Sequence, residues 1–186
     1  MVGNAFDVVF VCTGNRFRSP LAAAAFAATA TDQPIRVHSL GMLERRGEPA
    51  LAEALRVGAS FGLDLTIHRS RTLGDLDLAD MDLVIGFERK HIVGAAVDGH
   101  ARPEKSFLLL ELVGILDSVQ FPPADDVVER ARQAVALADA YRGTQTWTQS
   151  IADPWGGSAV QYEQTAAHVR DLSTRLGGQL FGTEGD

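Results

Sequence analysis

An apolar run, an abrupt polar loop and an alanine-rich stretch follow one another within the first 31 residues. Phe6–Val11 is apolar except for Asp7, which indicates a strand buried on both faces. Pro20–Thr31 predicts a helix, with Ser19 as its N-cap and Pro20 at its first position. A buried strand, a tight loop and a helix in this order are typical of the first unit of a parallel α/β fold.

The same alternation continues along the chain, without an internal repeat or a low-complexity linker. We expect further strands at Ile35–Ser39, Leu83–Phe87 and Ser106–Leu110, and helices at Pro49–Gly62, Arg89–Val97, Asp125–Arg142 and Ser158–Leu180. This pattern predicts a single doubly wound α/β domain over residues 1–186, with a four-stranded parallel sheet and helices on both faces. Residues 111–150 predict an extra helix and a loop inserted into the domain, either as a surface elaboration or as a lid that shapes substrate choice.

Composition narrows the class of protein. A net charge of −7 argues against broad nucleic-acid binding, which needs a basic face. No apolar run approaches the roughly 20 residues of a membrane span, and the first residues lack the features of a signal peptide. The chain contains one cysteine, so an internal disulfide is excluded, and we expect a protein of the reducing cytoplasm.

That cysteine, Cys12, follows the first strand and begins the polar loop. The next residues are Thr13, Gly14, Asn15, Arg16, Phe17, Arg18 and Ser19. A loop ahead of a helix N-terminus collects backbone N–H groups and favours an anion. A thiol in this position loses its proton more readily and becomes nucleophilic. Arg18 can bind two phosphoryl oxygens at once, so the loop predicts a phosphate site with a nucleophile beneath it.

Two loop residues suit the tight backbone path that such a site requires. Gly14 permits the backbone to turn closely, and Asn15 tolerates the left-handed conformation. The N–H groups from Thr13 to Arg18 are then expected to neutralise the phosphoryl charge.

The motif Cys-x5-Arg-Ser at residues 12–19, combined with Asp153-Pro154-Trp155 near the C-terminus, resembles the low-molecular-weight protein tyrosine phosphatases, and bacterial members in particular. The likeness covers residues 6–110 and 152–180. It implies a hydrolase that cleaves protein phosphotyrosine through a phosphocysteine intermediate. Cys12 would be the nucleophile, Arg18 would bind phosphate, and Asp153 would act first as general acid and then as general base.

The resemblance also assigns supporting residues. Asn15, Ser19, Ser39 and His68 would hold the loop by hydrogen bonds, and Trp155 would form one wall of the pocket. No metal or cofactor is implied. The expected partners are a phosphotyrosine-containing protein substrate and a tyrosine kinase. The remaining histidines, His91 among them, show no metal-ligand spacing and receive no role.

Two loop positions depart from the family pattern. Phe17 stands where many relatives carry a second cysteine, so oxidised Cys12 would lack an internal resolving thiol. The same absence disfavours an arsenate reductase, which relays electrons through additional cysteines. Arg16 stands where relatives that act on phosphoarginine carry threonine, and its charge would repel a guanidinium leaving group. Besides phosphoarginine hydrolysis, a phosphopeptide-binding module with weak catalysis stays open.

Overall fold

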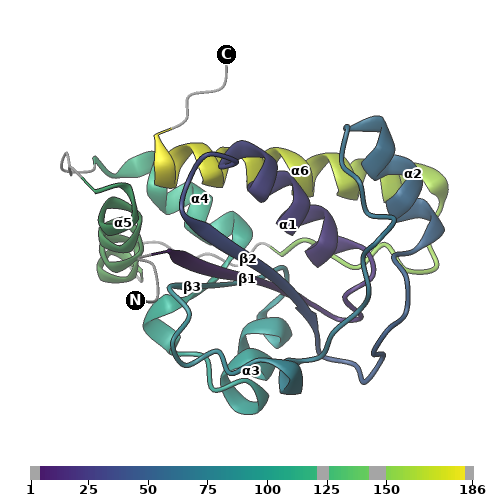
Figure 1. The fold of residues 1–186 in the computed structure, drawn as a ribbon, viewed down its shortest axis with the longest axis horizontal. Helices are drawn as coiled ribbons and strands as arrows, with labels where there is room; N and C mark the ends of the chain where they lie inside the picture. Colours follow the sequence, from purple (N-terminus) through teal and green to yellow (C-terminus); the bar gives the residue numbers. More distant parts are fainter. Residues whose placement is uncertain (1–4, 121–125, 143–149, 183–186) are drawn as a thin grey trace.

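The computed structural model describes residues 5–120, 126–142 and 150–182, and its elements follow the expected alternation (Figure 1). The strands are β1 (Phe6–Cys12), β2 (Ile35–Gly41), β3 (Leu83–Gly86) and β4 (Ser106–Leu108). The α-helices are α1 (Arg18–Thr29), α2 (Ala52–Ser60), α3 (Arg89–Asp98), α4 (Leu109–Ser118), α5 (Val127–Tyr141) and α6 (Ala159–Phe181). Two short 3-10 helices are η1 (Leu73–Asp75) and η2 (Pro103–Lys105).

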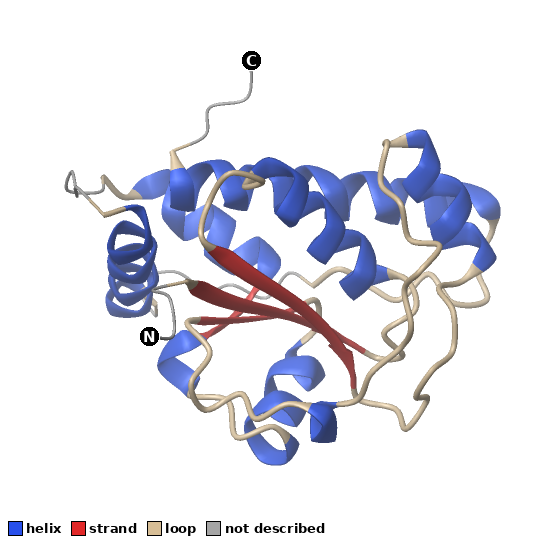
Figure 2. Cartoon of the chain, viewed as in Figure 1, coloured by secondary structure: helices blue, strands red, loops and turns tan. Residues whose placement is uncertain are grey.

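The four strands form one parallel sheet in the order β2-β1-β3-β4. β1 is therefore central, and its last residues pair with the ends of two neighbours: Cys12 with Gly41 of β2, and Val11 with Gly86 of β3. Loops leave this end of the sheet together (Figure 2). The order in which strands are added to the sheet reverses between β1 and β3, and open parallel sheets bind ligands at such a switch point.

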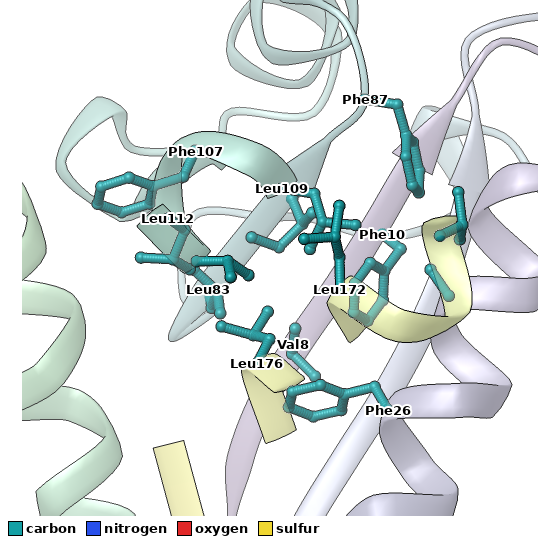
Figure 3. Packing of buried hydrophobic residues seen from close by; sticks show 14 of the residues in the cluster. Val8, Phe10, Phe26, Leu83, Phe87, Phe107, Leu109, Leu112, Leu172 and Leu176 are labelled. Carbon is teal, nitrogen blue, oxygen red and sulfur yellow. The ribbon is translucent and has the colours of Figure 1, made fainter. Parts of the chain in front are cut away.

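Alternate residues of β1 pack on opposite faces of the sheet. Phe6, Val8 and Phe10 lie in the larger apolar cluster, together with residues of α1, α4, α5 and α6 (Figure 3). Val9 and Val11 lie in a smaller cluster that includes residues of β3 and α3. In Figure 1, α1 and α6 lie on one side of the sheet and α3 on the other. The predicted doubly wound sheet with helices on both faces is confirmed, and the strand that carries Cys12 is fixed from both sides.

The start of α1 differs from the prediction. The helix begins at Arg18, and its N-cap is Phe17, which provides no side-chain hydrogen bond. Ser19 is not the N-cap because its hydroxyl faces Cys12 and Asn15 instead. Pro20 is the third helical residue, where the missing N–H still costs nothing, since the first turn of a helix leaves its N–H groups without intrahelical partners.

The predicted strand Ser106–Leu110 is too long, because β4 ends at Leu108 and α4 begins at once. Apolar side chains of α4 recur at helical spacing, and Leu109, Leu112, Val113 and Leu116 are buried. Glu111 accepts a hydrogen bond from the N–H of Leu108, 3.1 Å away, and so caps this helix. Residues 111–150 therefore contain most of α4 and all of α5, rather than one added helix.

The other helices agree with the expected ranges to within a few residues, α2 being the shortest relative to its prediction. The loop predicted between these helices and Asp153 falls partly on residues 143–149, which lie outside the described residues, as do residues 121–125. Within the described ranges, no helix is long and apolar enough to cross a membrane.

Candidate active site

A pocket of about 380 Å³ opens at the carboxyl end of β1. It is lined by Cys12, Thr13, Gly14, Arg16, Phe17, Arg18, Leu43, Arg45, Leu51, Asp153 and Trp155. Eight of these were predicted from the sequence as site residues. Residues separated by more than 130 positions thus meet at one cavity, because Arg18 contacts Asp153 directly.

The loop after Cys12 presents a set of backbone N–H groups at the pocket. Among the described residues, the N–H groups of Thr13, Gly14, Arg16, Phe17 and Arg18 donate to no protein acceptor. The remaining loop N–H, that of Asn15, donates to the Sγ atom of Cys12 at 3.3 Å. Buried or half-buried N–H groups rarely stay without a partner, so such a cluster at a helix N-terminus is typical of an anion site.

Asn15 holds the loop in shape. Its φ of 52° is left-handed, as expected for this residue, whereas Gly14 does not have a positive φ. The buried Asn15 side chain donates from Nδ2 to Ser19 Oγ at 2.9 Å and accepts the N–H of Arg71 at Oδ1, 2.8 Å away. Its backbone carbonyl accepts from His68 Nε2 at 2.7 Å. Asn15 therefore ties the loop to two other segments.

His68 acts on the loop as a hydrogen-bond donor rather than at the reacting centre. Burial lowers the pKa of His68, and the nearby charge of Arg69 lowers it further, although the bond to Asn15 opposes both effects. A neutral ring with its proton on Nε2 suits the carbonyl that it contacts. The structure thus places His68 where loop support was expected.

Ser19 lies directly beside the sulfur. Its Oγ atom is 3.0 Å from Cys12 Sγ and 3.3 Å from the carbonyl oxygen of Leu40, to which it can donate. Because Ser19 also accepts from Asn15, its single proton can go either to the sulfur or to Leu40. When the sulfur is a thiolate, the Ser19 hydroxyl can donate to it and stabilise the negative charge.

The fourth expected loop support, Ser39, does not join this network. It lies half-buried on β2 and makes no hydrogen bond to the loop in the portion of the chain that the structure describes. The neighbouring Leu40 carbonyl contacts Ser19 instead. At this end of β2, the contact with the loop is therefore made by the backbone of the next residue and not by the Ser39 side chain.

The Arg18 side chain is only 1% exposed, and hydrogen bonds on several sides hold it in place. Its NH1 atom donates to Glu88 Oε1 at 2.6 Å and to the Ile151 carbonyl at 2.9 Å. Its NH2 atom donates to Asp153 Oδ2 at 2.5 Å and to Thr13 Oγ1 at 3.1 Å. Two carboxylates therefore form ion pairs with this guanidinium, and NH2 is the end that faces the pocket residues.

Asp153 reaches the pocket on a loop anchored to the sheet. The N–H of Ile151 donates to the carbonyl of Phe87, 2.8 Å away, at the end of β3. The N–H of Trp155 donates to Asp153 Oδ1 at 3.2 Å, which orients the carboxylate. Trp155 itself is 70% exposed at the pocket mouth, so its ring is available to a ligand rather than to the core.

The two unusual loop residues turn out to have different surroundings. The Phe17 ring is buried and packs edge-to-face on Tyr162 of α6, with ring centroids 5.0 Å apart. Arg16 forms an ion pair with Glu48 at 2.6 Å and donates from Nε to the Pro49 carbonyl at 2.8 Å. Phe17 therefore joins the loop to the core, and the charge of Arg16 at the pocket wall is already partly neutralised.

Sequence reasoning did not identify three residues that contact the site: Glu88 pairs with Arg18, Gly41 packs against the loop, and His91 contacts Thr13. Glu88 follows β3, and a Cβ built on Gly41 at the end of β2 would lie 2.9 Å from the Asn15 nitrogen, so only glycine fits there. Glu88 and Gly41 could have been found from the predicted strands, because the carboxyl ends of the strands next to β1 must converge on the loop after Cys12.

Hydrogen bonds and charge lower the pKa of Glu88. Burial raises this pKa, but hydrogen bonds from Arg18 and Lys90 and the charge of Arg18 outweigh it. An ionised Glu88 suits a permanent partner of the Arg18 guanidinium. Within the described parts of the chain, no group of three or more His, Cys, Asp or Glu side chains is placed to hold a metal ion.

Comparison with known proteins gives consistent matches. Residues 7–114 match the family model described as low molecular weight phosphotyrosine protein phosphatase. A probable low molecular weight protein-tyrosine-phosphatase, EpsP of Ralstonia solanacearum, is 31% identical over 148 residues, covering 77% of this chain and 94% of that protein. A protein-arginine-phosphatase of Bacillus subtilis is 28% identical over 179 residues, covering 94% of this chain and 96% of that protein. The crystal structure of a low molecular weight protein tyrosine phosphatase from T. tengcongensis superposes with a TM-score of 0.69 at 26% identity, covering 92% and 97% of the two chains.

Proposed function

Because this chain belongs to the low molecular weight phosphotyrosine protein phosphatase family of hydrolases, we propose that it hydrolyses phosphotyrosine in proteins through a phosphocysteine intermediate. One observation carries the proposal. The Cys12 sulfur lies at the base of a loop whose free N–H groups, together with Arg18, surround a single pocket. A nucleophile below an anion site is what attack on a phosphomonoester requires.

In the proposed first step, the Cys12 thiolate attacks phosphorus and the bond to the tyrosine oxygen breaks. The free loop N–H groups and the Arg18 guanidinium bind the phosphoryl oxygens, where charge accumulates in the transition state. The phosphoryl dianion competes with Asp153 for the NH2 end of Arg18, while Glu88 and the Ile151 carbonyl keep NH1 in place. Arg18 therefore stays oriented as one of its anionic partners is exchanged.

Once displaced from Arg18, Asp153 is free to face the leaving oxygen. After taking up a proton from solvent, its carboxyl group donates that proton to the leaving oxygen, so tyrosine departs as a neutral phenol. In the second step, Asp153 takes a proton from water, the water oxygen bonds to phosphorus, and the bond to Cys12 Sγ breaks. The Ser19 hydroxyl, 3.0 Å from the sulfur, stabilises the departing thiolate, and inorganic phosphate is released.

The pocket walls favour an aryl phosphate. Leu43 and Leu51 line it, Leu43 being 45% exposed, and the Trp155 ring stands at the mouth. Apolar and aromatic surfaces suit a phenyl ring. Arg16 and Arg45 also line the pocket, and a cationic guanidinium leaving group gains nothing from them.

Phosphoarginine is the second candidate substrate, because the protein-arginine-phosphatase of B. subtilis aligns with 94% of this chain. Because Glu48 forms an ion pair with Arg16, the charge of Arg16 repels a guanidinium leaving group less strongly. The bulk of Arg16 at the wall still sets this pocket apart from one with threonine at that position, so a preference for phosphotyrosine is expected.

The experiment compares phosphotyrosine, phosphoarginine and phosphoserine peptides as substrates in a buffer containing EDTA. Wild type should release phosphate fastest from phosphotyrosine. Cys12→Ser should abolish turnover, and Asp153→Ala should lower it by about 10²- to 10⁴-fold, the usual contribution of a general acid. Arg16→Thr is the specificity variant, expected to narrow the gap between phosphotyrosine and phosphoarginine.

A folded wild type that binds phosphopeptides without releasing phosphate would overturn the enzyme and support a binding module instead. Preference of wild type for phosphoarginine would overturn the proposed substrate. We place the protein in the cytoplasm, where a reduced Cys12 is maintained, and its partners among tyrosine-phosphorylated proteins, a tyrosine kinase included.

A further inference from the structure

His91 is a buried histidine with no part in the reaction just described. It lies in the first turn of α3 and is fully buried. Its Nδ1 atom accepts two backbone hydrogen bonds, from the N–H of Phe87 at 3.2 Å and of Glu88 at 3.1 Å. An acceptor at Nδ1 carries no proton, so the proton of the neutral ring is on Nε2.

The Nε2 atom points at the phosphate-binding loop. It lies 3.1 Å from Thr13 Oγ1, so its N–H donates to this hydroxyl. Burial, with the charge of Arg18 adding to it, lowers the pKa of His91 to about 3, although Glu88 opposes this. The ring therefore remains neutral at ordinary pH, and the direction of this hydrogen bond is fixed.

Thr13 Oγ1 receives a second hydrogen bond, from Arg18 NH2 at 3.1 Å. A hydroxyl has two acceptor positions and one proton to donate. His91 and Arg18 occupy both acceptor positions, and the Thr13 hydroxyl proton has no protein acceptor within residues 5–120, 126–142 and 150–182. Thr13 is half-buried and lines the pocket beside Cys12 and Gly14.

We infer that the Thr13 hydroxyl donates a hydrogen bond to a phosphoryl oxygen of the substrate, and that His91 is the positioning residue that orients this hydroxyl. The inference rests on the proposed phosphatase function and extends the anion site beyond the backbone. With both lone pairs engaged, the hydroxyl cannot accept from the loop or rotate away. Its proton is directed into the pocket before substrate arrives, which is the preorganisation that stabilises a developing negative charge.

The sheet brings the two residues together. Thr13 follows β1 and His91 lies just beyond β3, strands that pair at Val11 and Gly86. The contact joins residues 78 positions apart. Because the Nδ1 side of His91 caps α3 while the Nε2 side contacts Thr13, the structural and the positioning roles of the ring can be separated by substitution.

The test uses Thr13→Val, which removes the hydroxyl at nearly constant shape, and Thr13→Ser, which restores it. His91→Asn keeps a side-chain acceptor for the helix cap but is too short to reach Thr13. His91→Gln restores an N–H near the Nε2 position. For each variant, kcat and KM are measured with an aryl phosphate, inhibition by inorganic phosphate is measured alongside, and thermal unfolding reports the folded state.

Thr13→Val should lower kcat/KM by about 10- to 100-fold and weaken inhibition by inorganic phosphate, as expected for loss of one hydrogen bond to a charged group. Thr13→Ser and His91→Gln should recover part of the loss. His91→Asn should lower kcat/KM in the wild-type background but have almost no further effect in Thr13→Val, because the group that it orients is then absent.

Activity of Thr13→Val within about twofold of wild type would overturn the inference, as would losses that add fully in the double variant. If His91→Asn does not fold, the Thr13 variants decide alone. Failure of the proposed function has a different signature, since wild type itself would then release no phosphate from the aryl phosphate.

Discussion

Replacing Asn15 should separate the two contributions that this residue makes to the active-site loop. Its side chain makes two buried hydrogen bonds, to Ser19 Oγ and from the N–H of Arg71, and its backbone has a φ of 52°. Asn15→Gly removes the hydrogen bonds but tolerates the left-handed backbone. Asn15→Ala removes the same bonds and keeps a Cβ in a conformation that L-residues avoid, without the polar side chain through which asparagine tolerates it.

The magnitudes follow from these contacts. Two buried hydrogen bonds at about 1 kcal/mol each, with the Arg71 N–H left without an acceptor, give a loss of about 2–4 kcal/mol for Asn15→Gly. Asn15→Ala should cost about 1 kcal/mol more, because strain at positive φ exceeds the gain from a stiffer unfolded chain. Urea unfolding of both variants measures the difference in the free energy of unfolding.

His100 provides a matched control. It also has a positive φ, of 60°, but its side chain is 73% exposed. His100→Ala should be about 1 kcal/mol less stable than His100→Gly, a difference that measures the backbone cost of a Cβ at positive φ alone. If Asn15→Gly matched wild type, or if Asn15→Ala and Asn15→Gly were equally stable while the His100 pair differed, the reasoning about the loop would be refuted.

Three further predictions follow from the same site. Gly41→Ala should lower kcat/KM about tenfold or more and lower the unfolding temperature, because its Cβ would lie 2.9 Å from the Asn15 nitrogen and displace the loop; unchanged kinetics would show that the loop can yield. Trp155→Ala should raise KM for phosphotyrosine peptides about three- to tenfold with little change in the unfolding temperature, because the ring is 70% exposed at the pocket mouth; an unchanged KM would remove Trp155 from the pocket wall. The pKa of His91, about 3, lies below the usual 6.5, so below pH 6.5 the unfolded chain binds a proton that the folded one does not, and stability present above pH 6.5 is lost as pH falls. Between pH 6.5 and 5 the contribution of His91 to this slope should approach about 1.4 kcal/mol per pH unit, and it should be missing from His91→Asn, which keeps only the contributions of other groups such as His38 and His68, whose pKa values are also lowered; equal slopes in urea unfolding of the two proteins would contradict it.

Most of the residues that meet at the pocket could be predicted because their signals are local or distinctive. Cys12 and Arg18 lie in one short loop after an apolar strand, and Asp153 is recognisable from its Asp-Pro context once that loop is known. The four-stranded parallel sheet follows from apolar runs that alternate with helical patterns. These signals act within a few residues, so a single sequence contains them.

Some contacts that orient these residues could not be predicted in the same way. Glu88 meets Arg18 from 70 positions away, and nothing in its own neighbourhood marks it as a partner. Ser39 has the expected chemistry but the wrong strand position, and Leu40 contributes a backbone carbonyl that no side-chain pattern reveals. Ser19 was expected both as the N-cap of the first helix and as a support of the loop, and its hydroxyl belongs to the loop network alone. Strand register and loop closure decide such contacts, and both arise only in the folded chain.

Trapping the covalent intermediate tests the central claim most directly. Asp153→Ala is mixed with a phosphotyrosine peptide, quenched rapidly in denaturant at alkaline pH and digested at alkaline pH, and the peptide that contains Cys12 is examined by mass spectrometry, with Cys12→Ala as the control. The account predicts a transient phosphoryl group on Cys12 that forms as tyrosine is released and is absent from the control. Tyrosine release from wild type without any phosphoryl group on Cys12, or continued turnover by Cys12→Ala, would contradict it.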